Sequence, residues 1–326
     1  MRNFTFKGLF LTAVFMLLGC LSIQAANDDL ITKQITINLD KAGTLPNKIA
    51  SSEMYKITNL KIIGEINGTD WNMIREMAGR DNRGYGTEGK LSVLDLSEAK
   101  IVKGGDSYYP GDNCYTSNDE IGEKAFTDCS RLTSLTLPVG ITSIGYDAFA
   151  YCSGLTSLTL PAGITSIGEY AFSGCSGLTS LTLPAGITSI DKYAFSGCSR
   201  LTSLTLPAGI TSIGEFAFSY CSGLTSIYVY AEKVPRIGRY AFEGCASRKC
   251  TLYVPKGTYD NYRLSEFGYF ENIVEFDATG IDKTTTSTDV EEVSRYSLNG
   301  QRLVGPTKGL NIVKYSDGSV KKVAVE

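Results

Sequence analysis

Histidine is absent from all 326 residues. Its absence excludes Ser–His–Asp and Cys–His catalysis, zinc sites built on imidazole, and the side chain that most often transfers protons near neutral pH. An enzyme built on carboxylates stays open, and residues 26–120 are the part of the chain that would house such a hydrolase. No two carboxylates there lie in a context typical of glycoside hydrolysis. We therefore expect a protein that is not an enzyme and that has no cofactor and no metal site.

The chain also lacks an excess of basic residues. It has 31 Lys and Arg against 34 Asp and Glu, a net charge of −3 and a pI of about 5.3. This balance gives no reason to expect nucleic acid as a partner. No long apolar run occurs after residue 25, so we expect no integral membrane span once the N-terminal segment is removed.

The one long apolar run lies at the N-terminus. Arg2 and Lys7 precede the apolar residues 8–23, and small alanines follow at 25 and 26. This order is typical of a signal peptide, and we predict cleavage after residue 25. An alternative is that "LLGC", ending at Cys20, is a lipobox and that Cys20 is lipidated. Both interpretations predict an exported protein, either secreted or held at the cell surface or outer membrane.

A unit of 23 residues is repeated along the middle of the chain. Five complete units begin at Leu132, Leu155, Leu178, Leu201 and Leu224. A partial unit (121–131) precedes them and a degenerate one (234–254) follows. Self-similarity at a fixed period of this length indicates a solenoid, in which each unit buries its apolar side chains by stacking on its neighbours.

Each unit predicts two short strands and a turn of helix. In the second unit, Leu155, Leu158 and Leu160 alternate with polar residues as in a strand with one buried face. "ITSI" (164–167) predicts another short strand, and "GEYAFSGC" (168–175) predicts a turn of helix with its apolar side chains buried. The phenylalanines at this position form a predicted ladder: Phe126, Phe149, Phe172, Phe195, Phe218 and Phe242.

The stretch "IGEYAFSGCSGLTSLTLP" (167–184) resembles the unit of the BspA-like leucine-rich repeat family, I-G-x-x-A-F-x-x-C-x-x-L-x-x-L-x-L-P. The resemblance covers residues 121–254. It implies an α+β repeat solenoid, a right-handed leucine-rich-repeat coil of short strands and helical turns that is capped at both ends. It also implies a cell-surface protein that binds proteins or glycans, with adhesion to host matrix or plasma glycoproteins or to other cells as the main expectation.

Five of the nine cysteines recur every 23 residues: Cys129, Cys152, Cys175, Cys198 and Cys221. This periodicity favours one buried structural position, because free cysteine behaves as a small hydrophobe. Disulfides between stacked coils and a metal site are the weaker alternatives. Cys245 and Cys250 depart from the period, and a local disulfide between them is an open alternative.

The strands present rows of hydroxyl groups on their outward side. Residues 132–223 hold 27 Ser and Thr and only six charged residues. The candidate binding residues are Thr136, Thr159, Thr182, Thr205, Tyr228, Ser157, Ser180 and Ser203. Such an array can contact a glycan or glycoprotein without charge. The alternatives are that the hydroxyls are merely solvated strand residues, or that they order water.

Tyrosines recur along the predicted helical edge of the repeats: Tyr146, Tyr151, Tyr170, Tyr193 and Tyr220. Exposed tyrosines are common interface anchors. The alternative for Tyr170 and Tyr193, which share one position of the repeat with Phe216, is that they cover the core.

The chain divides by composition into six segments. Residues 1–25 form the signal peptide, 26–102 an N-terminal cap region, and 103–254 the repeats. Residues 255–276 form a C-terminal cap, 277–292 a Thr-rich linker and 293–326 a small β module with hairpin signals at Asn299-Gly300 and Asp317-Gly318. The last segment is similar to the sorting tails of type IX secretion cargo. The alternative is an accessory domain.

The expected partner is a host or bacterial surface glycoprotein or glycan. The alternative function is that of a glycan-binding component without an adhesive role, or of a carboxylate hydrolase.

Overall fold

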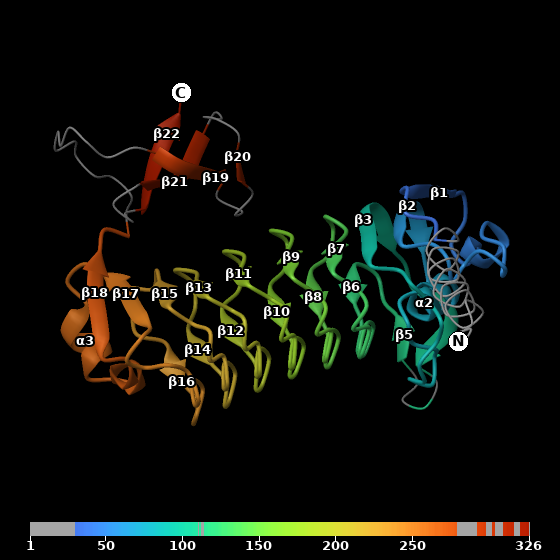
Figure 1. Ribbon diagram of the computed structural model, residues 1–326. Helices are drawn as coiled ribbons and strands as arrows, with labels where there is room; N and C mark the ends of the chain where they lie inside the picture. Colours follow the sequence, from blue (N-terminus) through green and yellow to red (C-terminus); the bar gives the residue numbers. More distant parts are fainter. Residues whose placement is uncertain are drawn as a thin grey trace, which may run out of the picture.

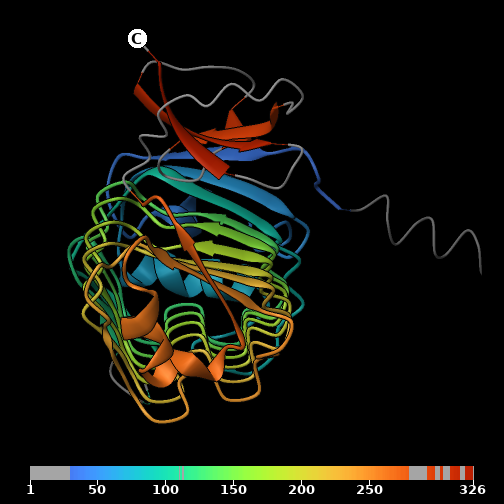
Figure 2. The same cartoon turned by 90° about the vertical axis from the view of Figure 1, so that its left-hand side faces the viewer.

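The computed structural model describes residues 30–109, 111, 114–278, 292–297, 302–303, 309–315 and 320–325. The predicted signal peptide with Cys20, most of the linker and both predicted hairpin turns lie outside the described residues. The described repeats wind into a long coil in which each turn stacks on the one before it (Figure 1). Seen along the coil, successive turns superimpose (Figure 2).

One side of the solenoid is a long parallel β surface. It consists of two five-stranded parallel sheets, which meet where the Thr179 N–H donates to the Thr156 carbonyl. In spatial order the strands are β1 (Ile35–Leu39), β2 (Asn59–Ile66), β3 (Val93–Ile101), β7 (Ser134–Thr136), β9 (Ser157–Thr159), β11 (Ser180–Thr182), β13 (Ser203–Leu206), β15 (Ser226–Val229), β17 (Thr251–Pro255) and β18 (Asn272–Phe276).

A second side carries the shorter strands. They form two three-stranded parallel sheets, with equivalent residues of adjacent coils paired. These strands are β6 (Glu120–Ile121), β8 (Ser143–Ile144), β10 (Ser166–Ile167), β12 (Ser189–Ile190), β14 (Ser212–Ile213) and β16 (Arg236–Ile237). Both strands that were predicted for each repeat unit are therefore confirmed.

The remaining elements flank the repeats or interrupt the coil. The helices among the described residues are α2 (Gly68–Met77) and α3 (Tyr259–Arg263), with short 3-10 turns η1 (Leu45–Asn47) and η3 (Glu266–Tyr269). β4 (Gly104–Tyr109) pairs antiparallel with β5 (Cys114–Thr116). Near the C-terminus an antiparallel sheet is formed by β19 (Glu292–Ser297), β20 (Arg302–Leu303), β21 (Gly309–Tyr315) and β22 (Val320–Val325).

The third side of each coil was predicted to be a turn of helix, and that prediction is wrong. Within 168–175, Tyr170 and Gly174 have left-handed φ angles of 57° and 70°. A left-handed residue interrupts the run of right-handed backbone angles that an α-helix requires. Alternate N–H groups of this edge donate to the following coil, as Phe172 N–H does to the Ala194 carbonyl at 2.7 Å. The N–H groups between them donate within their own coil, as Ala171 does to Gly168 at 3.3 Å. We call this side the turn edge. It contains no helix in the described repeats.

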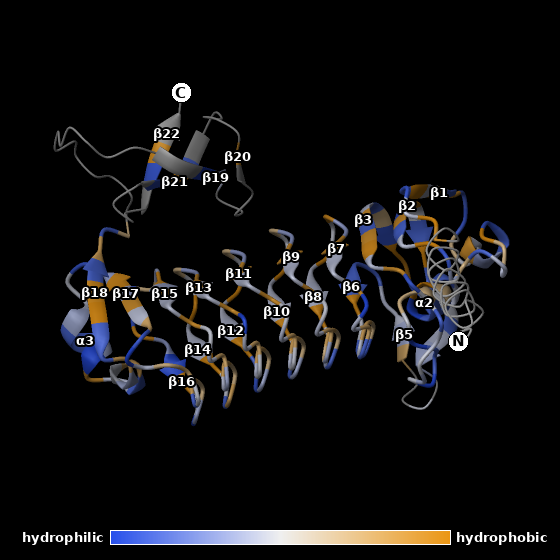
Figure 3. Ribbon diagram, viewed as in Figure 1, coloured by the Kyte–Doolittle hydropathy of each residue, from blue (hydrophilic) through white to orange (hydrophobic). Residues whose placement is uncertain are grey.

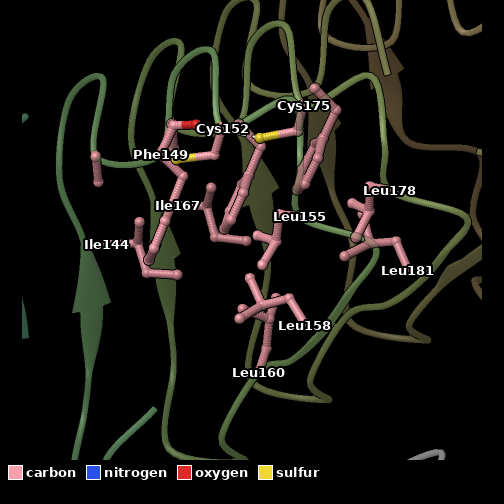
Figure 4. Packing of buried hydrophobic residues seen from close by; sticks show 14 of the residues in the cluster. Ile144, Phe149, Cys152, Leu155, Leu158, Leu160, Ile167, Cys175, Leu178 and Leu181 are labelled. Carbon is pink, nitrogen blue, oxygen red and sulfur yellow. Dashed lines mark hydrogen bonds between the residues drawn. The ribbon is translucent and has the colours of Figure 1, made fainter. Parts of the chain in front are cut away.

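Alternation of apolar and polar residues places the core inside the coil. Leu158 and Leu160 are buried between exposed Ser157 and Thr159. Figure 3 shows that hydrophobic residues recur at equivalent places in successive coils. In Figure 4 the equivalent side chains lie side by side across coils, as Leu155 does with Leu178. The stacking of equivalent side chains gives one continuous core along the solenoid.

The predicted phenylalanine ladder is confirmed and forms the centre of that core. Its six rings are buried and stacked, with neighbouring centroids 5.0–5.5 Å apart and interplanar angles of 13° or less. Aromatic pairs in such contact contribute about 0.5–1.5 kcal/mol beyond the area that they bury.

Other aromatic rings continue the ladder at both ends. Trp71 of α2 lies 5.1 Å from Phe126 at the N-terminal end and donates its indole N–H to the Ala125 carbonyl at 3.0 Å. At the C-terminal end, Phe267 and Phe270 lie 5.6 and 5.3 Å from Phe242. The terminal phenylalanines are therefore covered by rings from outside the repeats.

A buried arginine of α2 forms hydrogen bonds with the turn edge of the first coil. The Arg75 guanidinium donates to the carbonyls of Lys124 at 2.7 Å and Ala125 at 2.9 Å. The guanidinium also lies 5.3 Å from the ring of Tyr109. A buried cation needs such partners, because removal from water is costly.

The periodic cysteines occupy one buried position, as predicted. From the second coil on, each thiol donates to the backbone carbonyl of the phenylalanine of the preceding coil, as Cys175 does to Phe149 at 3.1 Å. Cys245 was expected to depart from this position, but its thiol donates to Phe218 at 3.2 Å in the same way. Cys245 and Cys250 are both free and buried, so the alternative of a disulfide between them is not realised in the structure. The reason is that Cys245 fills the periodic position inside the coil.

We predict that Phe172→Ala lowers the free energy of unfolding by about 3–5 kcal/mol, because it opens a cavity within the ladder. Urea denaturation followed by circular dichroism measures the change. Thr182→Ala on the outer surface is the control and should change it by less than about 0.5 kcal/mol. Equal effects of the two changes would contradict a core built on the ladder.

We also predict that the eight described thiols do not react with an aromatic disulfide reagent in the native protein at pH 8. Burial raises the pKa of Cys129 to about 11, and it raises the pKa of the Cys152 and Cys175 thiols as well. Since the thiolate is the reactive form, buried and protonated thiols are inert. The same reagent in concentrated denaturant should label them. Rapid labelling of the native protein would show that the thiols are accessible.

Candidate functional site

The outer surface of the long β side carries the predicted binding residues in two parallel rows. We define the Ser row as Ser134, Ser157, Ser180, Ser203 and Ser226, and the Thr row as Thr136, Thr159, Thr182, Thr205 and Tyr228. Strand register pairs neighbouring members directly, for example Ser157 with Ser134 and Thr205 with Tyr228. Ser157, Thr159, Ser180 and Thr182 are exposed, whereas Ser203 and Thr205 are half-buried.

Two kinds of threonine alternate on these strands. The first threonine of each "LTSL" bonds to the preceding coil: Thr156 Oγ1 donates to the Thr133 carbonyl at 3.0 Å, and Thr179 repeats this bond to Thr156 at 3.2 Å. In the Thr row, by contrast, the hydroxyls of Thr159 and Thr182 bond to no group of the described chain. The sequence alone does not distinguish the threonines that bond to the preceding coil from those of the Thr row. The hydroxyls of Thr159 and Thr182 are therefore available to an external ligand.

An aromatic cluster closes the C-terminal end of the two rows. Tyr228 and Tyr253 stack with centroids 4.4 Å apart and an interplanar angle of 5°. Phe276 meets Tyr230 edge to face at 5.1 Å. We call these four residues the aromatic end. Burial, and secondarily the neighbouring Tyr253, raises the pKa of Tyr228 to about 12. Only Tyr228 of this cluster was among the predicted binding residues. Tyr253 occupies the Thr-row position of the next coil, and Tyr230 lies where the consensus units have proline.

The C-terminal module touches the aromatic end. The ammonium group of Lys322, in β22, lies 4.8 Å from the ring centroid of Tyr230. Both views place this module outside the coils, beyond the long β side (Figures 1 and 2). A cation over an aromatic ring is attracted by the negative face of the ring.

The N-terminal end of the same surface is charged. Lys61 on β2 pairs with Asp95 at 3.5 Å and with Glu98 at 2.6 Å on β3. The bond to Glu98 raises the pKa of Lys61. Register places Lys61 and Asp95 in line with Thr136. The long surface therefore runs from an ion-paired end through uncharged hydroxyl groups to the aromatic end.

The turn edge carries a second aromatic ladder. Tyr170, Tyr193, Phe216 and Tyr240 stack with centroids 4.7–5.1 Å apart. Tyr170 and Tyr193 therefore satisfy the interpretation that they cover the core. Tyr151 and Tyr220 do not join this ladder and stay 60% and 59% exposed.

The described residues contain neither a helix long and apolar enough to cross a membrane nor three His, Cys, Asp or Glu side chains close enough to hold a metal ion.

Comparison with known families agrees with this geometry. Residues 119–249 match the model of the BspA type leucine rich repeat region, in six copies. Residues 119–249 are thus similar to BspA-type leucine-rich repeats, and the predicted resemblance is confirmed for that region. No curated protein matches the chain.

Several solved structures resemble the chain. A leucine rich repeat protein of T. pallidum is 30% identical over 42% of this chain and 62% of its own, with a TM-score of 0.38. A leucine-rich repeat protein of Bacteroides ovatus is 25% identical over 44% and 48%, with a TM-score of 0.34. A leucine rich cell surface protein of Faecalibacterium prausnitzii is 23% identical over 67% and 51%, also with 0.34. The chain therefore spans about half to three fifths of these relatives.

We predict that Tyr228→Phe removes one tyrosine with a pKa near 12 from the ionisation curve of the folded protein. Because the folded-state pKa is raised above the ordinary value of about 10, this tyrosine contributes stability below pH 10 that is lost as pH rises toward 12. Stopped-flow pH jumps can record tyrosinate absorbance before the protein unfolds. A difference curve between wild type and variant centred near pH 10 would show that Tyr228 is solvated.

Proposed function

We propose that this protein is exported and displayed at the cell surface, where it binds a host or bacterial surface glycoprotein or glycan. Adhesion to matrix or plasma glycoproteins, or to other cells, is the role we favour. The match of residues 119–249 to a repeat family that works by binding supports the general class. The N-terminal segment 1–25 supports export through its sequence.

The observation that carries the proposal is the uncharged hydroxyl surface. The hydroxyls of Thr159 and Thr182 bond to no group of the described chain, and their strands are hydrogen-bonded to neighbouring coils. Hydroxyl groups donate and accept hydrogen bonds without the desolvation cost of charge. Next to them, the aromatic end supplies the large apolar contact area that anchors interfaces.

Repetition strengthens such a surface. Near-identical coils offer the same weak contact several times, and a ligand with repeated groups gains affinity through simultaneous engagement. The outward Thr row and Tyr228 are therefore the residues that we assign to binding.

The division into an N-terminal cap region (26–102), repeats (103–254), a C-terminal cap (255–276), a linker (277–292) and a β module (293–326) belongs to the same proposal. The antiparallel pairing of β19 with β20 and of β21 with β22 supports a module with two hairpins. We propose that this module serves sorting or anchoring, and that an accessory role is its alternative. A glycan-binding component without adhesive function, or a carboxylate hydrolase in residues 26–120, would be the alternative to adhesion.

We predict that changing Thr159, Thr182 and Thr205 together to Glu weakens binding to the glycoprotein ligand at least tenfold, about 1.4 kcal/mol, because three carboxylates replace neutral hydroxyls in the contact. Surface plasmon resonance against fibronectin, fibrinogen and a glycan array measures the effect.

The matched control changes Ser166, Ser189 and Ser212 to Glu, which adds the same charge to the second side of the solenoid. Circular dichroism should show both variants folded. If the Thr-row variant binds as tightly as its control, the Thr row is not the contact surface. Turnover of a glycan by the wild type would favour the hydrolase.

A further inference from the structure

One position on the turn edge departs from the repeat in an unexpected way. It directly precedes the buried cysteine, and its backbone is left-handed in every coil, with φ between 58° and 74°. Its occupants are Asp128, Tyr151, Gly174, Gly197, Tyr220 and Gly244. Glycine adopts this conformation without steric strain, whereas tyrosine does not. Two of the six coils therefore carry a strained tyrosine where other coils carry glycine.

Burial does not explain these tyrosines. Tyr151 and Tyr220 are 60% and 59% exposed, and neither ring stacks on another described ring. The neighbouring left-handed position differs, because its aromatic residues stack into the ladder of Tyr170, Tyr193 and Phe216. The left-handed backbone of Tyr151 and Tyr220 is strained, and burial of their side chains does not offset that strain. This combination indicates a role other than folding.

Each of the two rings lies across a glycine of the following coil. A methyl group on Gly174 would lie 2.7 Å from Cδ1 of Tyr151, and one on Gly244 would lie 2.7 Å from Cδ1 of Tyr220. One side of each ring is thus held against the backbone while most of the side chain stays open to solvent. Gly197 lies between them, and only backbone of Gly174 approaches its Cβ position. The arrangement is two fixed aromatic platforms separated by a bare coil.

The surroundings of the platforms are polar, and their carboxylates outnumber their cations: Asp147, Glu169, Asp191 and Glu215 against Lys192 and Arg200. Two residues further along each coil, exposed Ser153, Ser199 and Ser222 border the same edge. Ser196 and Ser219 share a hydroxyl–hydroxyl hydrogen bond at 2.8 Å. Tyr151 and Tyr220 are three coil spacings apart, which places the platforms about 14 Å from each other at the usual strand spacing.

We propose that Tyr151 and Tyr220 are two stacking platforms for one neutral oligosaccharide chain, which lies along the turn edge across Gly197. The C–H faces of a sugar ring complement the negative face of an aromatic ring, and serine hydroxyls match sugar hydroxyls. The excess of carboxylates on this edge disfavours an acidic glycan. This site is on a different side of the solenoid from the Thr row and goes beyond the function proposed above.

The separation of the platforms sets a length requirement. A disaccharide reaches one ring, whereas a tetrasaccharide is long enough to contact both. Binding should therefore strengthen more than tenfold from the disaccharide to the tetrasaccharide of the same neutral glycan.

The test uses the full chain and an array of neutral oligosaccharides printed beside their sialylated and sulfated counterparts, followed by calorimetry on the strongest neutral hit. Tyr151→Gly and Tyr220→Gly should each weaken tetrasaccharide binding at least fivefold, and the double variant should lose it. The thermal unfolding midpoint should not fall, because glycine already fills this position in three coils. Disaccharide binding should be weakened by either single change only in part.

Two glycine variants form a matched pair. Gly174→Ala and Gly197→Ala impose the same left-handed strain, but only Gly174→Ala displaces the ring of Tyr151. The proposal expects weakened binding for Gly174→Ala and wild-type binding for Gly197→Ala. Absence of any neutral hit, preference for acidic glycans, or unchanged binding by the double tyrosine variant would overturn it. The triple Thr-row variant should bind the tetrasaccharide normally, so the two sites fail independently.

Discussion

Adjacent coils are joined by backbone hydrogen bonds on three sides, and this requirement for register governs the rest of the molecule. On the two strand sides the N–H groups of Thr156 and Gly168 donate to the preceding coil, whereas on the turn edge Phe149 N–H donates to the following one. Equivalent residues must therefore lie on one another. The units near the C-terminus contain extra residues, yet Ser226 still pairs with Thr251, because the additional residues lie between strands. The length of a unit therefore varies only between strands, where extra residues interrupt no hydrogen-bond ladder.

Much of the fold follows from the sequence because a fixed period determines which residues stack. The positions of Leu158, Ile167 and Phe172 are apolar in every unit, so alternation within one coil and repetition between coils both predict their burial. The same logic predicts the rows on the outer surface, since Thr159 lies two residues from the strand start in each coil. The strands, the phenylalanine ladder and the buried cysteine position could thus be read directly from the repeat.

The turn edge could not be predicted in this way. "GEYAFSGC" has the apolar spacing of a helical turn, but spacing does not reveal that two of its residues are left-handed, one of them Tyr170. Hydrogen bonds to the next coil determine whether this stretch is a helical turn or a left-handed turn, and the sequence of a single unit does not show them. For the same reason the sequence does not reveal the role of Thr156, whose hydroxyl bonds to the preceding coil. At Cys245 the extra residue in the unit concealed a position that is structurally equivalent to the others.

The candidate binding residues illustrate how an array acquires specificity. Stacking makes every coil alike, so a distinct site requires a residue that breaks the pattern, and its neighbours must accommodate the change. Tyr228 replaces the threonine of its row and is accepted because Tyr253 stacks on it in the next coil. Tyr151 replaces glycine and is accepted because Gly174 leaves room for its ring. Each departure therefore involves two coils, and the pair of residues, rather than the single substitution, marks the site. In a solenoid of this kind, paired departures from the repeat are more informative about binding than the conserved ladder beneath them, since the ladder is already explained by packing.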